Sequence, residues 1–275
     1  MKNPSPHTLL HVICDYVEGG MEFGEINTRL VHWLDAPEKV TIHTTSVPSL
    51  ETLPIGFVSA QYALAECNKR MMIYGNAAPR RSKDVAVENN IGNGIKYAKL
   101  KNGVEIVNVY SEFAFGFFKD QIVEFRDIDC PTGGSQFRSR DFFPERVAKL
   151  INGDYSVLGE KLNIDDIPEI PSNLVAWTDG FGNIKTTMRE SHLQKLGFKP
   201  GQKVVVRLNG VKTVGLIAIG GFSVDRGVLA VNIGSSGHGD NFVELFLRVH
   251  HISEKTAAVR FDYPVSGTEF EIKAL

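Results

Sequence analysis

The feature that most constrains the fold is the alternation of short apolar runs with longer helical patterns in the first third of the chain. Leu9–Cys14, Val40–His43 and Met71–Tyr74 are short apolar runs of strand type. Residues 23–34 and 53–64, which lie between these runs, carry apolar side chains at helical spacing. Strands that alternate with helices are joined by crossover connections, which favour a parallel sheet. The sequence therefore predicts an α/β domain with a largely parallel sheet.

The predicted domain continues beyond these three strands. Two more strands are expected around residues 104–110 and 121–127, followed by a helix over about residues 143–151. Residues 89–101 are rich in Gly and Asn, which predicts a loop or a hairpin tip. We place the N-terminal α/β domain at residues 1–155.

The sequence changes character near residue 172. Residues 156–172 contain Pro168 and Pro171 without clear periodicity, and we interpret them as a linker. The next domain, residues 173–275, carries short β-rich segments separated by Gly and Asn: Val175–Trp177, Lys203–Leu208, Gly215–Ile219, Val228–Asn232 and Val243–Leu247. This pattern predicts an all-β, barrel-like C-terminal domain.

Composition limits the classes of partner. The 275 residues include 30 basic and 32 acidic side chains, and this balance gives no electrostatic footprint for nucleic acid or an anionic membrane. No apolar run approaches the ~18 residues needed to span a bilayer, and residues 1–7 lack the apolar core of a signal peptide. Three scattered cysteines favour a reducing compartment. We expect a cytoplasmic protein with a small-molecule substrate and no nucleic-acid or membrane partner.

The sequence shows no pattern for a metal or a phosphate-bearing cofactor. His250 and His251 are adjacent, and neighbours in a strand point to opposite faces. No Cys or His spacing fits a zinc site, and neither a P-loop nor a dinucleotide-binding glycine fingerprint is found. We therefore expect no metal site and no cofactor.

Candidate ligand contacts in the N-terminal domain are polar residues beside strand ends. Asp15 follows the first strand, where a carboxylate can accept both hydroxyls of a ribose diol. An Asp that only caps the following turn is the more common case. Arg80–Arg81 and Arg138–Asp141 place guanidinium groups beside loops, where they can hold anions or oriented water. Most Arg clusters are solvated surface, so both interpretations stay open.

Two loops are candidates in the C-terminal domain. Asp179–Asn183 follows a strand and has two glycines around an aromatic residue. Asn232–Gly237 is a strand end that runs into a loop of small residues, whose N–H and hydroxyl groups suit a carboxylate or a phosphate. Ordinary turn chemistry explains both segments equally well.

Taken together and in order, these segments resemble the enzymes that attack the 5′ carbon of S-adenosyl-L-methionine, namely the hydroxide adenosyltransferase, fluorinase and chlorinase family. The resemblance covers about residues 9–275. It is carried by Ile13–Tyr16, Thr44–Pro48, Ile55–Phe57, Phe137–Asp141, Asp179–Asn183, Phe222, Val231–Asn232 and Ser235–Gly237. Its most specific part is the Asp179–Asn183 turn followed by the Ser235–Gly237 loop.

The resemblance implies an N-terminal α/β domain, a C-terminal β-barrel and a homotrimer whose ligand lies between one subunit's first domain and its neighbour's barrel. It also implies substrate contacts without a cofactor: Asp15 at the ribose diol, Leu50 near the ribose where the family has a large aromatic, Asp179 at the methionine ammonium, Asn183 at the adenine edge, Phe222 stacked on adenine, and Ser235 and Ser236 at the methionine carboxylate.

The residues around the attacking group differ from the family pattern. Members that use hydroxide carry an Asp, an Arg and a His, and the matching positions here are Tyr74, Arg81 and Arg138. Tyr74 and Ser139 instead resemble the halogenases, yet the halide loop is not recognisable in Gly75–Pro79. These four residues, Tyr74, Arg81, Arg138 and Ser139, are the candidate catalytic side chains.

The resemblance implies cleavage of S-adenosyl-L-methionine by water or hydroxide, giving adenosine and methionine. The sulfonium is already a leaving group, so the enzyme must mainly position a nucleophile, which can contribute ~7–11 kcal/mol. Arg81 would stabilise hydroxide and Tyr74 would orient it. The alternatives are a halide-using 5′-halogenase, a catalytically silent protein that binds S-adenosylmethionine or adenosine, and an enzyme for another nucleoside.

Overall fold

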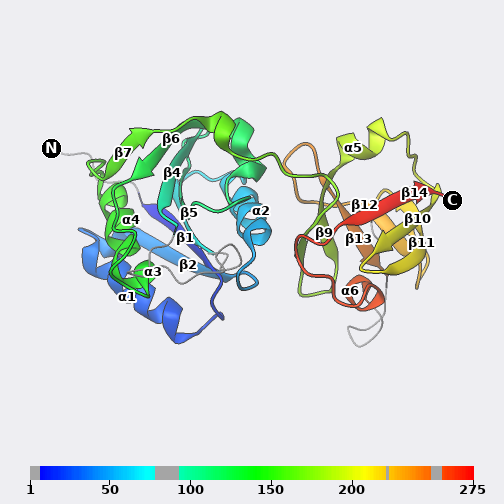
Figure 1. Ribbon diagram of the computed structural model, residues 1–275, viewed down its shortest axis with the longest axis horizontal. Coiled ribbons are helices and arrows are strands. Elements are labelled where there is room, and N and C mark those ends of the chain that lie inside the picture. The colour runs from blue at the N-terminus through cyan, green and yellow to red at the C-terminus, as the bar shows by residue number, and fades with distance from the viewer. Residues whose placement is uncertain (1–6, 78–92, 221–222, 249–255) are drawn as a thin grey trace. The chain divides into compact units, whose positions relative to one another are not determined.

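The computed structural model describes residues 7–77, 93–220, 223–248 and 256–275. The chain divides into two compact units, Met1–Glu169 and Ile170–Leu275, each with a seven-stranded sheet in its described residues (Figure 1). The predicted linker over residues 156–172 contains strand β7 (Leu158–Lys161), which pairs with β6 (Ile122–Ile128). Part of that segment therefore belongs to the sheet of the first unit. Within the described ranges, no helix is long and apolar enough to cross a membrane.

The first unit is built on a mixed sheet with the strand order β2-β1-β3-β5-β4-β6-β7. Its other strands are β1 (Thr8–Cys14), β2 (Val40–Ser46), β3 (Arg70–Asn76), β4 (Ile95–Leu100) and β5 (Glu105–Val109). Strands β2, β1, β3 and β5 run parallel to one another, whereas β4, β6 and β7 join as antiparallel neighbours. The expected parallel arrangement is thus found in one part of the sheet and is not confirmed for the whole.

Strand β4 corrects the sequence interpretation of residues 89–101 as a loop or hairpin tip. Residues 93 and 94 precede the strand without regular structure, and residues 89–92 lie outside the described residues. Ile95, Tyr97 and Leu100 are buried in the sheet. A tight turn at Gly103, with φ +86°, joins β4 to β5, and so short a connection allows only antiparallel pairing.

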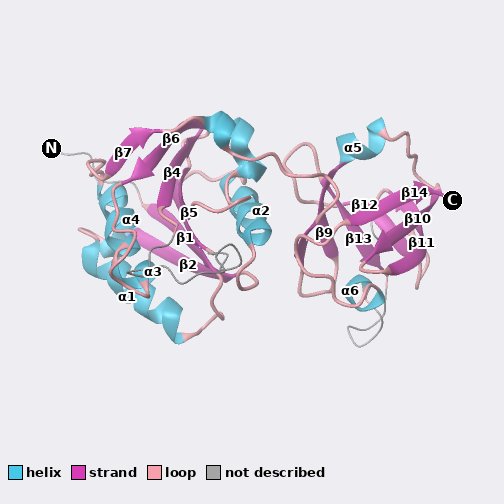
Figure 2. Cartoon of the chain, in the orientation of Figure 1, coloured by secondary structure: helices cyan, strands magenta, loops and turns pink. Residues whose placement is uncertain are grey.

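Helices cover both faces of this sheet (Figure 2). Helices α1 (Met21–Trp33), α3 (Arg138–Asp141) and α4 (Phe143–Asn152) pack together on one face, and α2 (Thr52–Ala63) packs on the other beside the 3₁₀ helix η3 (Gly116–Gln121). In α1 the buried residues Phe23, Ile26 and Leu30 form one stripe at helical spacing. Helix α4 has Pro144 in its first turn and is followed by Gly153 in the left-handed conformation, and these two residues favour its start and its stop.

The parallel strands end together at what we call the carboxyl edge of the first sheet. Cys14 is in register with Ser46 on β2 and with Asn76 on β3, which are the last residues of those strands. Side chains that follow these residues therefore converge on one edge. The opposite, amino edge is where Arg70 and Glu105 begin β3 and β5.

The second unit is a curled sheet with the order β14-β10-β11-β12-β13-β9-β8. Its elements are β8 (Val175–Thr178), β9 (Ile184–Arg189), α5 (Glu190–Lys195), β10 (Lys203–Leu208), β11 (Val211–Ala218), β12 (Leu229–Ile233), β13 (Phe242–Leu247), α6 (Ala257–Arg260) and β14 (Phe270–Ala274). Among the strand pairs that the structure describes in this unit, only β11–β12 is parallel.

The two edge strands of this second sheet meet. Leu174, just before β8, forms a bridge with Glu269, just before β14. The backbone N–H of Val175 donates to the carbonyl of Thr268 at 2.9 Å. The sheet thus curls upon itself, and the second unit is β-rich and barrel-like, with the short helices α5 and α6 added.

Candidate functional site

Asp15 lies at the carboxyl edge, directly after β1, and its carboxylate orders the next loop. Its Oδ2 accepts the backbone N–H of Leu50 at 3.1 Å, and its carbonyl accepts the Ser49 hydroxyl at 3.1 Å. Leu50 has φ +65°, a left-handed conformation that costs a side-chain-bearing residue about 1–2 kcal/mol. The Asp15 hydrogen bond therefore holds a strained loop, and such strain gathers at ligand sites.

An open depression of about 410 Å³ lies beside this carboxylate. It is lined by Asp15, Tyr16, Val17, Glu18, Ser46, Val47, Pro48 and Ser49. The Ser46 hydroxyl donates to the carbonyl of Tyr16 at 2.6 Å, which ties the end of β2 to the loop after β1. Of the two predicted ribose contacts, Asp15 lines this concave surface, and Leu50 is hydrogen-bonded to it.

Ser139 and Tyr74 meet beneath this edge. Tyr74 is fully buried, and its hydroxyl donates to the backbone carbonyl of Ser139 at 3.1 Å. Burial raises the pKa of Tyr74 well above its ordinary value, so the phenol stays protonated at neutral pH. The structure brings these two predicted residues together, but the Tyr74 proton is committed to a protein carbonyl.

The hydrogen bonds of Arg138 go to residues other than Tyr74 and Ser139. Arg138 Nη1 donates to the carbonyls of Asn93 and Thr132, both at 3.0 Å, and the guanidinium lies over the ring of Phe143. Desolvation on burial lowers the pKa of Arg138. Arg81 lies outside the described residues. Arg138 Nη1 thus connects the two loops that contain Asn93 and Thr132.

Tyr16 is a site residue that the sequence reasoning passed over. Its hydroxyl lies 2.8 Å from Ser139 Oγ, and Asn76 Nδ2 donates to it at 3.2 Å. Desolvation raises the pKa of Tyr16 although both hydrogen bonds oppose the shift. A polar aromatic residue directly after Asp15, the Asp that follows β1, is the signal that could have identified it.

In the second unit, Asp179 is held inside its own turn. Its Oδ1 accepts the backbone N–H groups of Phe181 at 2.9 Å and Asn183 at 3.0 Å, and its Oδ2 accepts Asn183 Nδ2 at 3.0 Å. Gly182 has φ +74°, and a Cβ at this position would meet Thr256 Oγ1 at 2.4 Å, so the turn requires glycine. Asp179 and Asn183 are therefore preorganised as one unit.

A polar line connects this turn to the Ser-Ser loop. The Lys185 ammonium contacts the Glu244 carboxylate and lies 3.7 Å from Asp179 Oδ2. Glu244 Oε1 in turn accepts Asn232 Nδ2 at 2.9 Å, near the end of β12. Two carboxylates against one ammonium leave this line with a surplus negative charge. Lys185 and Glu244 were not predicted as site residues.

The Ser-Ser loop begins three residues after Asn232. Ser235 is exposed, and the backbone carbonyl of Ser236 accepts the N–H of Phe242 at 2.8 Å. Phe222, the predicted adenine-stacking residue, lies outside the described residues. The structure therefore links Asp179 and Asn183 through the polar line to Asn232, which lies three residues before Ser235.

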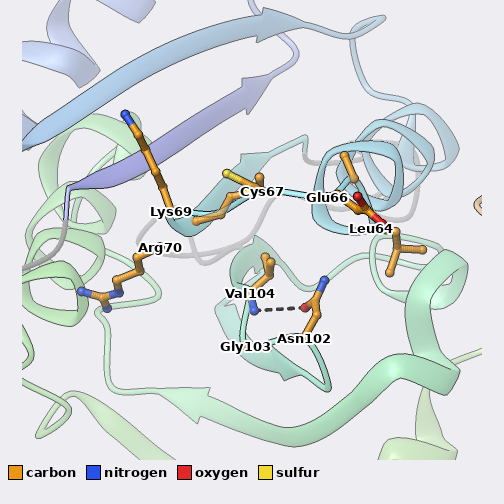
Figure 3. Close-up of a pocket in the computed structure, with 10 residues that line it drawn as sticks. Leu64, Glu66, Cys67, Lys69, Arg70, Asn102, Gly103 and Val104 are labelled. Atoms are coloured by element: carbon orange, nitrogen blue, oxygen red, sulfur yellow. Dashed lines mark hydrogen bonds between the residues drawn. The ribbon is translucent and has the colours of Figure 1, made fainter.

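The amino edge of the first sheet holds a second concavity, and it differs in kind (Figure 3). This pocket of about 350 Å³ is lined by Leu64, Ala65, Glu66, Cys67, Lys69, Arg70, Met71, Asn102, Gly103 and Val104. The buried Glu105 accepts Arg70 Nη2 at 2.7 Å and the hydroxyls of Tyr97 and Tyr155 at 2.8 Å each. The polar groups of this edge are thus paired with one another.

No metal site is indicated in the part of the chain that the structure describes, because no three His, Cys, Asp or Glu side chains are grouped to hold an ion. The first unit offers a carboxylate beside a strained loop and a pair of bonded hydroxyls. The second unit by itself offers a preorganised Asp–Asn turn.

Comparison with known proteins places the fold in a group with solved structures. No family model and no curated protein matches the sequence. An uncharacterized conserved protein from Thermotoga maritima superposes with a TM-score of 0.70 at 17% identity, over 96% of this chain and 99% of that chain. A conserved hypothetical protein from Thermus thermophilus gives 0.62 at 12% identity, over 96% and 99%. At these identities the likeness shows a shared fold alone.

Proposed function

We propose that this protein binds S-adenosyl-L-methionine and cleaves it by attack of water on the ribose 5′ carbon. The observation that carries the proposal is the Asp15 carboxylate at the carboxyl edge, held beside the strained Leu50 and an open depression. A carboxylate so placed suits the two hydroxyls of a ribose. The sequence resemblance supplies the identity of the ligand.

The residues of the second unit support the binding of the methionine end. The polar line Asp179–Lys185–Glu244 has one more carboxylate than ammonium, which favours a cationic group such as the methionine ammonium. An amide has two N–H donors and a carbonyl acceptor, so Asn183 keeps bonding capacity for an adenine edge after donating once to Asp179. Ser235 and Ser236 would take the carboxylate.

The chemistry needs little from the protein beyond binding and positioning. Water oxygen forms a bond to C5′ while the C5′–S bond breaks and its electron pair returns to sulfur. The products are adenosine and methionine, and one proton is released to solvent. Because the sulfur is positively charged at the start, the leaving group needs no acid. Turnover should be slow, since the absence of a general base typically costs ~10²–10⁴ in rate.

A catalytically silent binder is the second candidate, and one observation favours it. The Tyr74 hydroxyl and the Arg138 guanidinium, two of the predicted catalytic groups, donate to backbone carbonyls. The Tyr74 proton and the Nη1 protons of Arg138 are therefore not available to hold a nucleophile. A halogenase is a weaker candidate because the halide loop is not recognisable in the sequence.

We further propose a homotrimer with ligand sites shared between subunits, since the candidate residues are divided between the two units of the chain. Light scattering at assay concentration should give three times the chain mass of 30.4 kDa. A monomer that still binds the ligand fully would contradict this shared arrangement.

The decisive experiment is incubation with S-adenosylmethionine, followed by chromatography of the products. We expect slow formation of equal amounts of adenosine and methionine, unaffected by added chloride or fluoride. A 5′-halogenated adenosine would identify a halogenase. Tight binding in calorimetry without any product would identify the silent binder, and no binding at millimolar concentration would exclude both.

A further inference from the structure

One arginine anchors the serine loop, residues 234–241, to the sheet of the second unit. Arg189 is the last residue of β9 and lies opposite Phe242, the first residue of β13, with its guanidinium 4.0 Å from the centre of that ring. Its Nη1 donates to the carbonyl of Asp240 at 2.8 Å and to that of Gly237 at 3.5 Å. The Arg189 side chain thus packs on a ring and holds the loop at two points.

The backbone carbonyls and the backbone N–H groups of this loop are used differently. The Ser236 carbonyl accepts the N–H of Phe242, and the Asn241 carbonyl accepts the N–H of Glu190, both at 2.8 Å. Within the described part of the chain, no acceptor is found for the backbone N–H groups of Ser235, Ser236, Gly237 and Gly239. Protein donors therefore occupy carbonyls of the loop, and N–H groups are left over.

Backbone N–H groups left over in a turn attract anions. Successive N–H groups in a turn carry partial positive charge and bind anionic groups. Ser235 and Gly239 are exposed, so a ligand can reach the loop. The acidic side chain of the loop, Asp240, is bonded elsewhere, because its Oδ1 and Oδ2 accept the N–H and the hydroxyl of Ser191 at 3.0 and 2.7 Å. This carboxylate is therefore not the acceptor of the leftover N–H groups.

We propose that Arg189 is a positioning residue, which keeps the serine loop folded so that its N–H groups bind the carboxylate of the methionine end. The inference rests on the proposed function. An arginine suits this role better than a lysine, because one planar guanidinium can stack on Phe242 and bridge two carbonyls at the same time. Selectivity for ligands that carry a carboxylate therefore depends on Arg189.

The test compares ligands with and without a carboxylate on Arg189→Met. The probes are S-adenosylmethionine, its decarboxylated analogue and adenosine, each measured by calorimetry. Wild type should bind S-adenosylmethionine more tightly than the decarboxylated analogue. Arg189→Met should weaken S-adenosylmethionine binding about tenfold, the range of a hydrogen bond to a charged group, and leave the other two affinities within about twofold.

Arg189→Lys separates positioning from charge. Lysine keeps the positive charge but lacks the planar set of donors, so S-adenosylmethionine should still bind more weakly than to wild type, with the other two ligands unchanged. An S-adenosylmethionine affinity equal to that of wild type would show that only the charge matters, and would overturn the inference. If thermal unfolding shows that Arg189→Met does not fold, Arg189→Lys carries the test alone.

Arg207→Met is the matched control. Arg207 belongs to β10 of the same unit, and its largely exposed side chain places Nε 3.8 Å from a Glu271 carboxylate oxygen. The substitution removes the same charge from the unit and should leave all three affinities unchanged.

Equal losses for S-adenosylmethionine and its decarboxylated analogue in Arg189→Met would indicate a general disturbance of the unit and reject the inference. Unchanged S-adenosylmethionine affinity would also reject it, with the proposed function left standing. A wild type that binds these two ligands equally would remove the carboxylate contact of the serine loop, and the inference with it. A wild type that binds neither S-adenosylmethionine nor adenosine would instead remove the proposed function itself.

Discussion

At the amino edge of the first sheet, Glu105 accepts hydrogen bonds from Arg70, Tyr97 and Tyr155. At the carboxyl edge, Tyr16 and Ser139 share one bond and leave one proton over. The first edge is a closed network that also ties down the end of α4, since Arg70 donates to the carbonyls of Leu150 and Ile151. Groups that satisfy one another stabilise a fold, and groups left with bonding capacity are available to a ligand.

The largest expected effect is a loss of folding stability when the closed network at the amino edge is broken. Glu105→Gln should lower the free energy of unfolding of the first unit by about 3 kcal/mol, because the mostly buried Arg70 guanidinium loses its counter-charge. In a Trp177→Phe background, fluorescence of Trp33 would follow the first unit alone during urea unfolding. Adenosine affinity of the folded variant should not change.

Glu124→Gln provides the matched control for that measurement. Glu124 pairs with Arg126 at 3.5 Å, and both side chains are partly exposed. Such a pair contributes about 0–1 kcal/mol. If the two variants lost equal stability, the amino edge would not be the structural network described above.

The second effect is a loss of adenosine affinity when the carboxyl edge is changed. Asp15→Ala should weaken adenosine binding about ten- to a hundredfold, because a charged acceptor for the ribose hydroxyls is lost. Asp15→Asn keeps an oxygen for the Leu50 N–H and should fall between wild type and Asp15→Ala. Unchanged affinity in the Ala variant, measured by calorimetry, would reject Asp15 as the ribose contact.

The smallest expected effect is that of thiol modification on adenosine affinity. Thiol labelling distinguishes the two edges of the first sheet without any mutation. Cys67 is exposed and lines the pocket of Figure 3, whereas Cys14 is buried at the end of β1. The thiolate is the reacting form, and burial raises the pKa of the Cys14 thiol well above its ordinary value. A thiol reagent at about pH 8 should modify Cys67 rapidly and Cys14 only on unfolding. Modified Cys67 should leave adenosine affinity within about twofold, and a larger loss would move the ligand site to the amino edge.

The same burial gives the first unit a dependence on alkaline pH. The folded pKa of Cys14 lies above its unfolded value of about 8.5, so the neutral thiol contributes full stability below that value. The contribution is lost as the pH rises further, and unfolding should become easier between about pH 8.5 and 10. Cys14→Ala should flatten this part of the stability profile, which urea titrations at several pH values would measure.

Much of the fold was predictable because hydrophobic periodicity marks buried elements. Strands β1, β2 and β3 and helices α1, α2 and α4 lie where their apolar patterns placed them. Strands β9 and β14 were missed, since both are short and carry charged side chains among the apolar ones. Strand β4 was missed because a Gly- and Asn-rich stretch precedes it, and local turn chemistry gave no sign of the strand beyond.

The candidate site was predictable only in part. The motifs identified Asp15, Leu50 and Ser139, which the structure places around one edge. They could not show that Arg138 Nη1 would donate to two loop carbonyls, since hydrogen-bond partners depend on packing. Tyr16 and Lys185 escaped for the same reason, because each acts through a partner on another strand or helix.

The meeting of the edge strands in the second unit sets an order of events during synthesis. The first sheet is complete once β7 has left the ribosome, so its unit can fold while the rest of the chain is still being translated. The second sheet cannot be completed so early. Strand β10 pairs with β14, and the start of β8 bonds to residues 267–269, all of which are translated later. Until then its strand edges are open to neighbouring chains, and this stretch of translation is where a chaperone would matter most.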